Sequence, residues 1–272
     1  MEPMDLHTHS NMSDGTCTPS LLVEKAKAAG LGILALTDHD CIQGIPEAME
    51  AGERLGIRVV PGLELDTEFH TELHMLGLGV DPQHPALQEF AARNAQRRQA
   101  RNEAILNQLA AAGVDVRPFF PAQHGTPTRL HVALALVAGG FAPTIGEAFR
   151  NYLFRGTPGY VETKRILPED AIALIHQAGG LAVLAHPCKV KADVAALMAR
   201  LHPAGLDGLE AFYPTATPGQ RDTYISMAQQ YGMLLTCGSD FHGDNRPDNR
   251  LGCTWQQSPL LEPVYTWLLQ RS

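Results

Sequence analysis

Several features that would mark particular classes of protein are missing from this sequence. Its five cysteines are an odd number without a Cys-x-x-Cys pair, which argues against a disulfide framework and favours reduced thiols. No apolar run approaches the length of a membrane span and no N-terminal signal pattern is visible. We therefore expect a cytoplasmic protein without a membrane partner.

Basic residues are also scarce relative to acidic ones. The 21 lysines and arginines face 29 aspartates and glutamates, and the formal net charge is −8. This balance argues against a surface that tracks long nucleic acid, because such a surface needs clustered positive charge. With 44% hydrophobic residues in 272, the chain has enough apolar material for one large domain or two modest ones. The twelve histidines are the unusual part of the composition.

Apolar runs alternate with helical patterns in both the first and the last third of the chain. After a short N-terminal run that ends near His9, the expected strands are residues 31–37, 57–61, 73–80, 181–185, 208–212 and 233–237. The helices expected between and after them are residues 19–29, 46–55, 168–177, 192–201, 220–231 and 260–270. Buried strands that alternate with helices are typical of parallel βα units.

The alternation breaks in the middle of the chain. Helical patterns cover residues 85–112, 127–138 and 144–153, with no convincing strand between them. We therefore predict an α/β domain formed by residues 1–84 and 164–272. A helical insertion, or lid domain, of residues 85–163 would interrupt it.

Metal-ligating residue types follow the expected strands. His7 and His9 lie one residue apart, and on a strand their side chains would share a face. The other candidates lie near strand ends, except for Asp14, which follows the first pair, and His74, which is near a strand start: Asp14, His39, Glu64, His74, His186, Asp240 and His242. The carboxyl ends of parallel strands meet at one mouth of a barrel. The pattern predicts a metal site there.

The same residues resemble the motifs of a known family. His7-Thr8-His9, Thr37-Asp38-His39, Glu64 after Pro61-Gly62-Leu63, His186-Pro187 and Asp240-Phe241-His242 are similar, in order, to the motifs of the PHP (polymerase and histidinol phosphatase) family. The resemblance covers almost the whole chain. It implies a distorted (β/α)7 barrel with a three-metal cluster, and the insertion resembles that of small phosphoesterases acting on nucleoside 3′,5′-bisphosphates.

The resemblance also implies a division of the ligands. His7, His9 and Asp240 would hold one metal and Glu64 would bridge to a second, which His74 and His186 complete. Asp14, His39 and His242 would hold the third. Because the carboxylate of Asp14 is a harder ligand than the histidine of some relatives, Mn²⁺ is favoured, with Fe²⁺ and Zn²⁺ as alternatives.

Such a site would suit phosphate chemistry. Its positive charge would attract a phosphate dianion, and a metal-bridging hydroxide would attack the phosphorus directly. The predicted catalytic residues are His7, His9, Glu64, Asp240 and His242. The resemblance assigns Arg129 and Lys164 to phosphate binding, and Tyr213 would stack on a base.

Four functions remain open at this stage. The first is removal of the 3′-phosphate from a nucleoside 3′,5′-bisphosphate, with a small-molecule nucleotide as the substrate. The alternatives with the same metals are a 5′→3′ exonuclease on short oligoribonucleotides and a histidinol phosphate phosphatase. The fourth is a C–N hydrolase of the amidohydrolase type, which also opens on His-x-His but bridges its metals with a lysine. The sequence does not predict an oligomeric state.

Overall fold

The computed structural model describes residues 1–120 and 125–270. Contacts within the chain divide it into two compact units, one formed by residues 1–90 and 165–272 and the other by residues 91–164. The predicted boundaries lie nearby, at 84/85 and 163/164. The role of the second unit as a lid stays a prediction.

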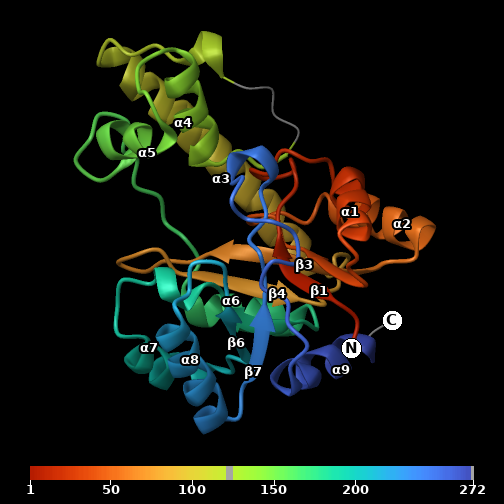
Figure 1. Ribbon diagram of the computed structural model, residues 1–272. Helices are drawn as coiled ribbons and strands as arrows, with labels where there is room; N and C mark the ends of the chain where they lie inside the picture. The colour runs from red at the N-terminus through yellow and green to blue at the C-terminus, as the bar shows by residue number, and fades with distance from the viewer. Residues whose placement is uncertain (121–124, 271–272) are drawn as a thin grey trace. The chain divides into compact units, whose positions relative to one another are not determined.

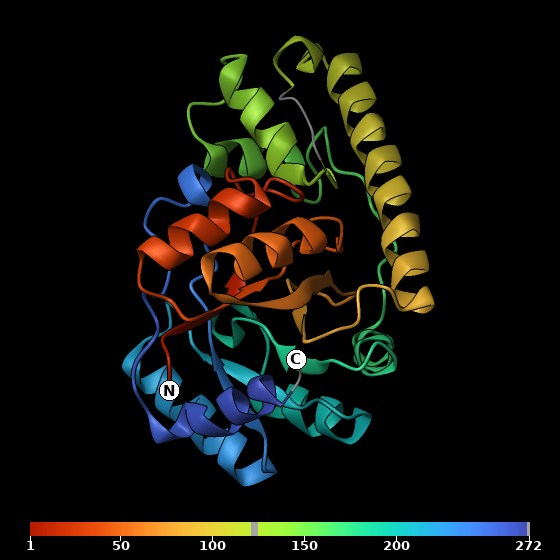
Figure 2. The same cartoon turned by 90° about the vertical axis from the view of Figure 1, so that its right-hand side faces the viewer.

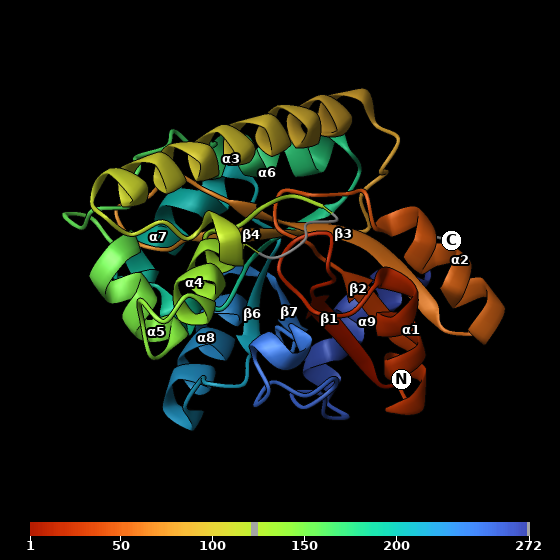
Figure 3. The ribbon, with the colours of Figure 1, turned by 90° about the horizontal axis from the view of Figure 1, so that it is seen from above.

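The first unit is built on a seven-stranded sheet in which neighbouring strands follow the order of the chain (Figure 1). The strands are β1 (Met4–Thr8), β2 (Ile33–Leu36), β3 (Arg58–Asp66), β4 (His74–Leu78), β5 (Leu181–Leu184), β6 (Gly208–Phe212) and β7 (Leu234–Cys237). The sheet curls until Thr8 at the end of β1 pairs with Phe241, just beyond β7. Seen from above, the strands form a nearly closed barrel (Figure 3). The predicted barrel is thus confirmed.

One strand of the barrel runs against the others. β4 is antiparallel to both β3 and β5, whereas the pairings from β1 to β3 and from β5 to β7 are parallel. The sequence predicted no helix between β3 and β4, and residues 67–73 are too short for the helical crossover that parallel neighbours require. The reversal turns the start of β4 toward the carboxyl ends of its neighbours.

The barrel helices form where the sequence supplies their end signals. They are α1 (Pro19–Ala28), α2 (Ile45–Leu55), α6 (Pro168–Gln177), α7 (Val194–Leu201), α8 (Pro218–Tyr231) and α9 (Glu262–Leu269). The Thr18 side chain caps α1 by accepting from the amide of Leu21. α2 ends at Gly56, whose φ of 64° only glycine adopts readily. Figure 3 shows α1, α2 and α8 outside the strands.

The core of the first unit lies within and around the barrel. Every residue of β1, β2, β4, β5 and β6 is buried, and burial of a strand on both faces explains why β2 and β5 are continuous apolar runs. The buried polar residues of β1 are individually satisfied: the Thr8 hydroxyl donates to the Ala35 carbonyl, and Asp5 accepts from the amides of Ser239 and Gly252. These contacts tie β1 to both of its neighbours.

The second unit has its own apolar core. It receives most of α3 (Pro85–Ala111), shown in yellow in Figure 2, and contains α4 (Arg129–Ala138) and α5 (Ile145–Ala148). Leu109 of α3 packs in one cluster with Val132 and Leu136 of α4. At the start of α4, the Thr128 amide donates to His131 Nδ1, and the Thr128 side chain accepts from the Leu130 amide. Across the described residues of both units, no helix is both long and apolar enough to cross a membrane.

Candidate metal centre

Backbone pairing at the barrel rim brings the first three candidate ligands together. Beyond the end of β1, the His9 amide donates to the Phe241 carbonyl at 2.9 Å, and the Asp240 amide donates to the His7 carbonyl at 2.9 Å. This pairing between the first and last strands places Asp240 Oδ1 3.6 Å from His7 Nε2 and 3.3 Å from His9 Nε2. Residues separated by most of the chain therefore share one site.

Two further pairings bring in the next four ligands. His39, which follows β2, forms a short parallel bridge with Glu64 within β3. Across the next two strands, the amide of Ala185 donates to the His74 carbonyl, which sets His186 beside His74. His74 reaches the rim because β4 is reversed, so a histidine at a strand start joins histidines at strand ends. Glu64 was expected after its strand and instead lies inside the longer β3.

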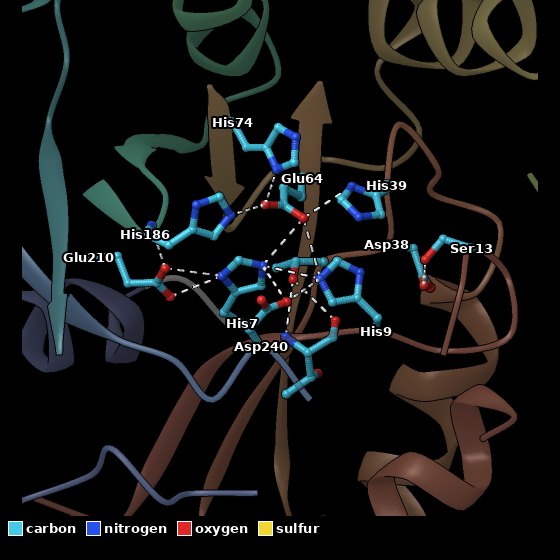
Figure 4. Close-up of polar contacts among 12 residues, drawn as sticks. His7, His9, Ser13, Asp38, His39, Glu64, His74, His186, Glu210 and Asp240 are labelled. Carbon is cyan, nitrogen blue, oxygen red and sulfur yellow. Dashed lines mark hydrogen bonds and ion pairs between the residues drawn. The ribbon is translucent and has the colours of Figure 1, made fainter. Parts of the chain in front are cut away.

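Glu64 lies at the centre of this cluster, and its two oxygens face different histidines (Figure 4). Oε1 is 2.8 Å from His74 Nδ1 and 2.9 Å from His186 Nε2. Oε2 faces the remaining three imidazoles, at 3.4, 3.3 and 3.1 Å from His7, His9 and His39. A carboxylate whose oxygens divide in this way is arranged to bridge two cations.

A second group of ligand atoms surrounds Asp14. Its Oδ1 is 3.3 Å from His242 Nε2 and 3.9 Å from His9 Nδ1, and its Oδ2 is 3.7 Å from His39 Nε2. Among the residues that the structure describes, Asp14 Oδ1, His9 Nδ1 and His242 Nε2 are buried atoms without a hydrogen-bond partner. Buried lone pairs left in this way are costly, and a cation would satisfy all three. The residues present therefore fit a metal.

Asp38 fixes the loop that carries Asp14. It is almost fully buried and accepts from the hydroxyls of Ser10 and Ser13, each at 2.6 Å, and from the Ser10 amide at 2.8 Å. Figure 4 shows the Asp38–Ser13 contact beside the cluster. These bonds hold residues 10–14 against the end of β2, so the position of Asp14 is set before any ligand binds.

The buried groups of the cluster shift one another's pKa values. Burial acts to raise the pKa of Glu64, but the charges of His39 and His74 outweigh it and hold the pKa well below its usual value. The pKa of Asp14 is lowered in the same way, against burial, by His39 and His242. Burial and the neighbouring His242 depress the pKa of His9. Against the effect of burial, the carboxylates around His7 and His74 raise the pKa values of these two histidines, that of His74 to about 10. The carboxylates are thus ionised, as metal binding requires, whereas His7 and His74 would release protons when a cation binds.

Backbone strain gathers at the same place. Among the described residues, the non-glycine positions with positive φ are Asp40 at 49°, His186 at 29° and Asp240 at 53°. All three follow barrel strands within or beside the cluster. Such conformations cost of order 1–3 kcal/mol each and persist where the surrounding structure requires them. Two of the three, His186 and Asp240, are candidate ligands of the cluster.

Two acidic residues behind the cluster were not predicted. Glu210 in β6 is fully buried and accepts from His7 Nδ1 at 3.0 Å and from the His186 amide at 2.7 Å (Figure 4). Asp66 approaches His74 Nε2 at 3.3 Å and forms an ion pair with Arg165. A carboxylate on one ring nitrogen orients the imidazole and leaves its other nitrogen for a cation. The signal for Glu210 was an acidic residue in a buried strand.

The predicted substrate residues occupy different surroundings. Arg129 is the first residue of α4 and Lys164 is exposed, and both belong to the second unit. Tyr213 belongs to the first unit and is buried, with its hydroxyl donating to Asp240 Oδ2 at 2.6 Å and its ring edge-on to His186. The roles predicted for these residues, and for the catalytic and metal-binding residues, stay predictions.

Comparison with known proteins gives one family. The PHP domain family matches residues 5–185. The chain is 38% identical to the 5′-3′ exoribonuclease Rnm of Salmonella typhimurium over 88% of this chain and 84% of that protein. It is 33% identical to a 3′,5′-nucleoside bisphosphate phosphatase of Chromobacterium violaceum over 100% of this chain and 98% of that protein.

Solved structures agree in fold over nearly the whole chain. A structure described as an amidohydrolase from Chromobacterium violaceum, with bound sulfate and no metal, has a TM-score of 0.88 and 32% identity, covering 99% of this chain and 96% of that one. A structure assigned as a metal-dependent phosphoesterase of Bifidobacterium adolescentis has a TM-score of 0.82 and 28% identity, covering 98% and 97%.

Proposed function

The chain belongs to the PHP domain family, and we propose that it removes the 3′-phosphate from nucleoside 3′,5′-bisphosphates. The relatives named here that match over most of the chain are phosphoric ester hydrolases by name. The nucleotide substrate is supported by the bisphosphate phosphatase of Chromobacterium violaceum, to which the chain is similar over its full length.

The observation that carries the proposal is the position of Glu64. Its two oxygens face separate groups of imidazoles, and this supports adjacent cations bridged by one carboxylate, as phosphoester hydrolases use. We propose three divalent cations, the third near Asp14, with Mn²⁺ favoured. When bound, they would supply an activated water for attack and positive charge for the phosphate.

Other residues of the protein would orient the candidate ligands and bind the substrate. Glu210 would orient His7, and Asp38 would hold the Asp14 loop in place. The bridging position held by Glu64 rather than a lysine speaks against a C–N hydrolase of the amidohydrolase type. Arg129 and Lys164 remain the residues proposed to bind the second phosphate, on the strength of the sequence resemblance alone.

A second function has its own support. The similarity to Rnm favours 5′→3′ exonuclease activity on short oligoribonucleotides, and the same metal centre would serve both reactions. The net charge of −8 disfavours long substrates but not a few nucleotides.

A panel of substrates tests the proposal. Mn²⁺-loaded protein is assayed for phosphate or nucleotide release from adenosine 3′,5′-bisphosphate, AMP, histidinol phosphate and a 5′-phosphorylated trinucleotide. We expect the highest kcat/KM for the bisphosphate, with AMP as the product. A higher kcat/KM for the trinucleotide would replace the proposal with the exonuclease, and one for histidinol phosphate would reject both.

The same assay tests Arg129. Losing a charge-assisted hydrogen bond of about 1.5–3 kcal/mol should raise the KM of Arg129→Ala for the bisphosphate roughly 10–100-fold. An aryl phosphate, which has a single phosphate, should be hydrolysed as by the unaltered protein. Equal effects on both substrates would remove Arg129 from recognition of the second phosphate.

A further inference from the structure

Two positively charged side chains, Lys189 and Arg246, and the hydroxyl of Tyr213 donate to one oxygen of Asp240. Oδ1 faces His7 and His9, as a metal ligand would. Oδ2 accepts from the Tyr213 hydroxyl at 2.6 Å, from Lys189 Nζ at 3.0 Å and from Nη1 of Arg246. The two oxygens of Asp240 therefore have separate surroundings, one in the metal centre and one among hydrogen-bond donors.

These donors exceed what is needed to orient the carboxylate. The buried hydroxyl of Tyr213 already fixes Oδ2 with a short hydrogen bond. Among the described residues, the side chains of Lys189 and Arg246 each donate a hydrogen bond to Asp240 and to no other side chain. An ammonium offers three donors and a guanidinium five, so most of the donors of this pair remain available to a ligand.

The two cations also lie where a ligand would arrive. The side chain of Asp240 is 2% exposed, whereas those of Lys189 and Arg246 are 28% and 36% exposed. Each cation therefore has one end at the cluster and the other in solvent. Burying a cation this close to the cluster is favourable only with a negative partner, and Asp240 must divide its charge between the pair and a metal.

The loops that carry the cations are the loops that carry ligands. Lys189 closes the short 3₁₀ turn Pro187–Lys189 directly after His186, and its amide donates to the His186 carbonyl. Arg246 follows the turn Gly243–Asn245 directly after His242. Both residues belong to the first unit, so their distance from the cluster is fixed by the barrel itself.

We propose that Lys189 and Arg246 form a clamp for the phosphoryl group under attack, while Tyr213 holds Asp240 as a ligand. The proposal rests on phosphoester hydrolysis as the function. Donors this close to the cluster can reach the same phosphate as the metals, and the guanidinium fork matches two phosphate oxygens. The clamp would therefore act on every phosphate ester, in contrast to Arg129 and Lys164, which are proposed for the second phosphate.

Lys189→Met and Arg246→Met test the clamp, with Lys191→Met and Arg250→Met as matched controls on exposed cations of the same two loops. Calorimetry measures the affinity of the Mn²⁺-loaded proteins for inorganic phosphate. Kinetics are measured with an aryl phosphate and with adenosine 3′,5′-bisphosphate, and bound metal is measured by elemental analysis.

Each clamp variant should lose about 10-fold or more in phosphate affinity and about 10²-fold in kcat/KM, because a charge that stabilises the transition state is removed. The loss should be equal for both substrates, the metal content should stay complete, and the controls should behave like the unaltered protein. Arg246→Lys should recover part of the activity, since it keeps the charge and loses the fork.

Tyr213→Phe distinguishes direct binding of phosphate by Lys189 and Arg246 from an indirect effect in which they only hold Asp240 in place. It removes one donor from Oδ2 without changing charge, so it should weaken metal binding and leave the phosphate affinity of the fully loaded protein unchanged. If Lys189→Met and Arg246→Met lose metal together with activity, as Tyr213→Phe would, the two cations act through Asp240 and the clamp is wrong. Unchanged phosphate affinity in both variants would also reject it.

If the proposed bisphosphate phosphatase function were wrong, the results would differ from those expected if the clamp were wrong. The unaltered protein would then prefer the aryl phosphate or another ester to the bisphosphate, while the clamp variants would still lose activity on whichever ester is hydrolysed. If no ester were hydrolysed, the phosphate affinities would decide the clamp by themselves.

Discussion

At the scale of single residues, Glu210 shows how a buried charge can serve a neighbour. It is fully buried and contacts two candidate ligands, the ring of His7 and the amide of His186. A buried carboxylate is costly unless its oxygens are bonded, and here both oxygens have partners. The arrangement fixes the direction in which His7 presents Nε2 to the cluster.

Glu210→Gln should therefore weaken metal binding without unfolding the protein. Glutamine keeps the shape but has one acceptor oxygen in place of two, so it cannot serve His7 and His186 equally. We expect metal affinity to fall about 10–100-fold, as on losing other partners of metal-ligating histidines. Titration with Mn²⁺ against a competing chelator measures this change.

Glu169→Gln provides the matched control. Glu169 is a carboxylate of the same type, partly exposed in the first turn of α6, and it is paired with Arg200 at 2.6 Å rather than with a candidate metal ligand. Its loss should leave metal affinity unchanged. If the two variants bind metal alike, Glu210 has a structural role only.

At the scale of elements, β4 explains what sequence could and could not predict. Strand positions and most helix ends followed from apolar runs, prolines and glycines. The candidate ligands were proposed from their places near the ends of those strands. The direction of β4 was not predicted, because β3 was expected to end near Pro61 and the shortness of its connection to β4 could not be seen. His74 was a candidate ligand near a strand start, and only the reversal of β4 explains how it comes beside candidates at strand ends.

Residues without a periodic or motif signal were harder to predict. Lys189 and Arg246 lie in irregular turns, and no local pattern states that two loops from different strands converge on Asp240. Glu210 did carry a signal, an acidic residue in a buried strand, but its partner His7 is brought close only by closure of the barrel.

The packing of β6 against the segment after β7 leads to a prediction at Gly238. A Cβ at this position would overlap Oε1 of Glu210 and Cβ of His7. Gly238→Ala must move one of these side chains, and we expect a loss of about 1–3 kcal/mol in the free energy of unfolding together with weaker metal binding. Urea denaturation and metal titration measure the two effects.

Gly219→Ala is the control for this change. Gly219 lies in the first turn of α8, and nothing lies within 4 Å of a Cβ built there. Alanine in this open helical position should be neutral or stabilise by up to about 1 kcal/mol. A loss at Gly219 equal to that at Gly238 would show that overlap with Glu210 and His7 is not the cause.

At the scale of the whole molecule, the cluster lies where the first strand of the barrel meets the segment after the last strand. Its ligands come from β1 and from the segment after β7, as well as from the strands between them. A cation held by His9, Asp14 and His242 would therefore connect residues that are far apart in the chain. Metal binding should then stabilise the first unit, because the unfolded chain offers no comparable site.

Removal of metal should accordingly lower the melting temperature of the protein. A ligand at 100 times its Kd adds about 2.7 kcal/mol to the folded state, so stripping with a chelator should cost several degrees, and added Mn²⁺ should restore them. Asp14→Asn, which alters one group of ligands, should show a smaller shift. Hydrogen exchange should quicken in β1 and β7 and stay unchanged in α4, whose core belongs to the second unit. Equal melting temperatures with and without chelator would contradict a resident metal, because a cation bound to this cluster cannot leave folding unaffected.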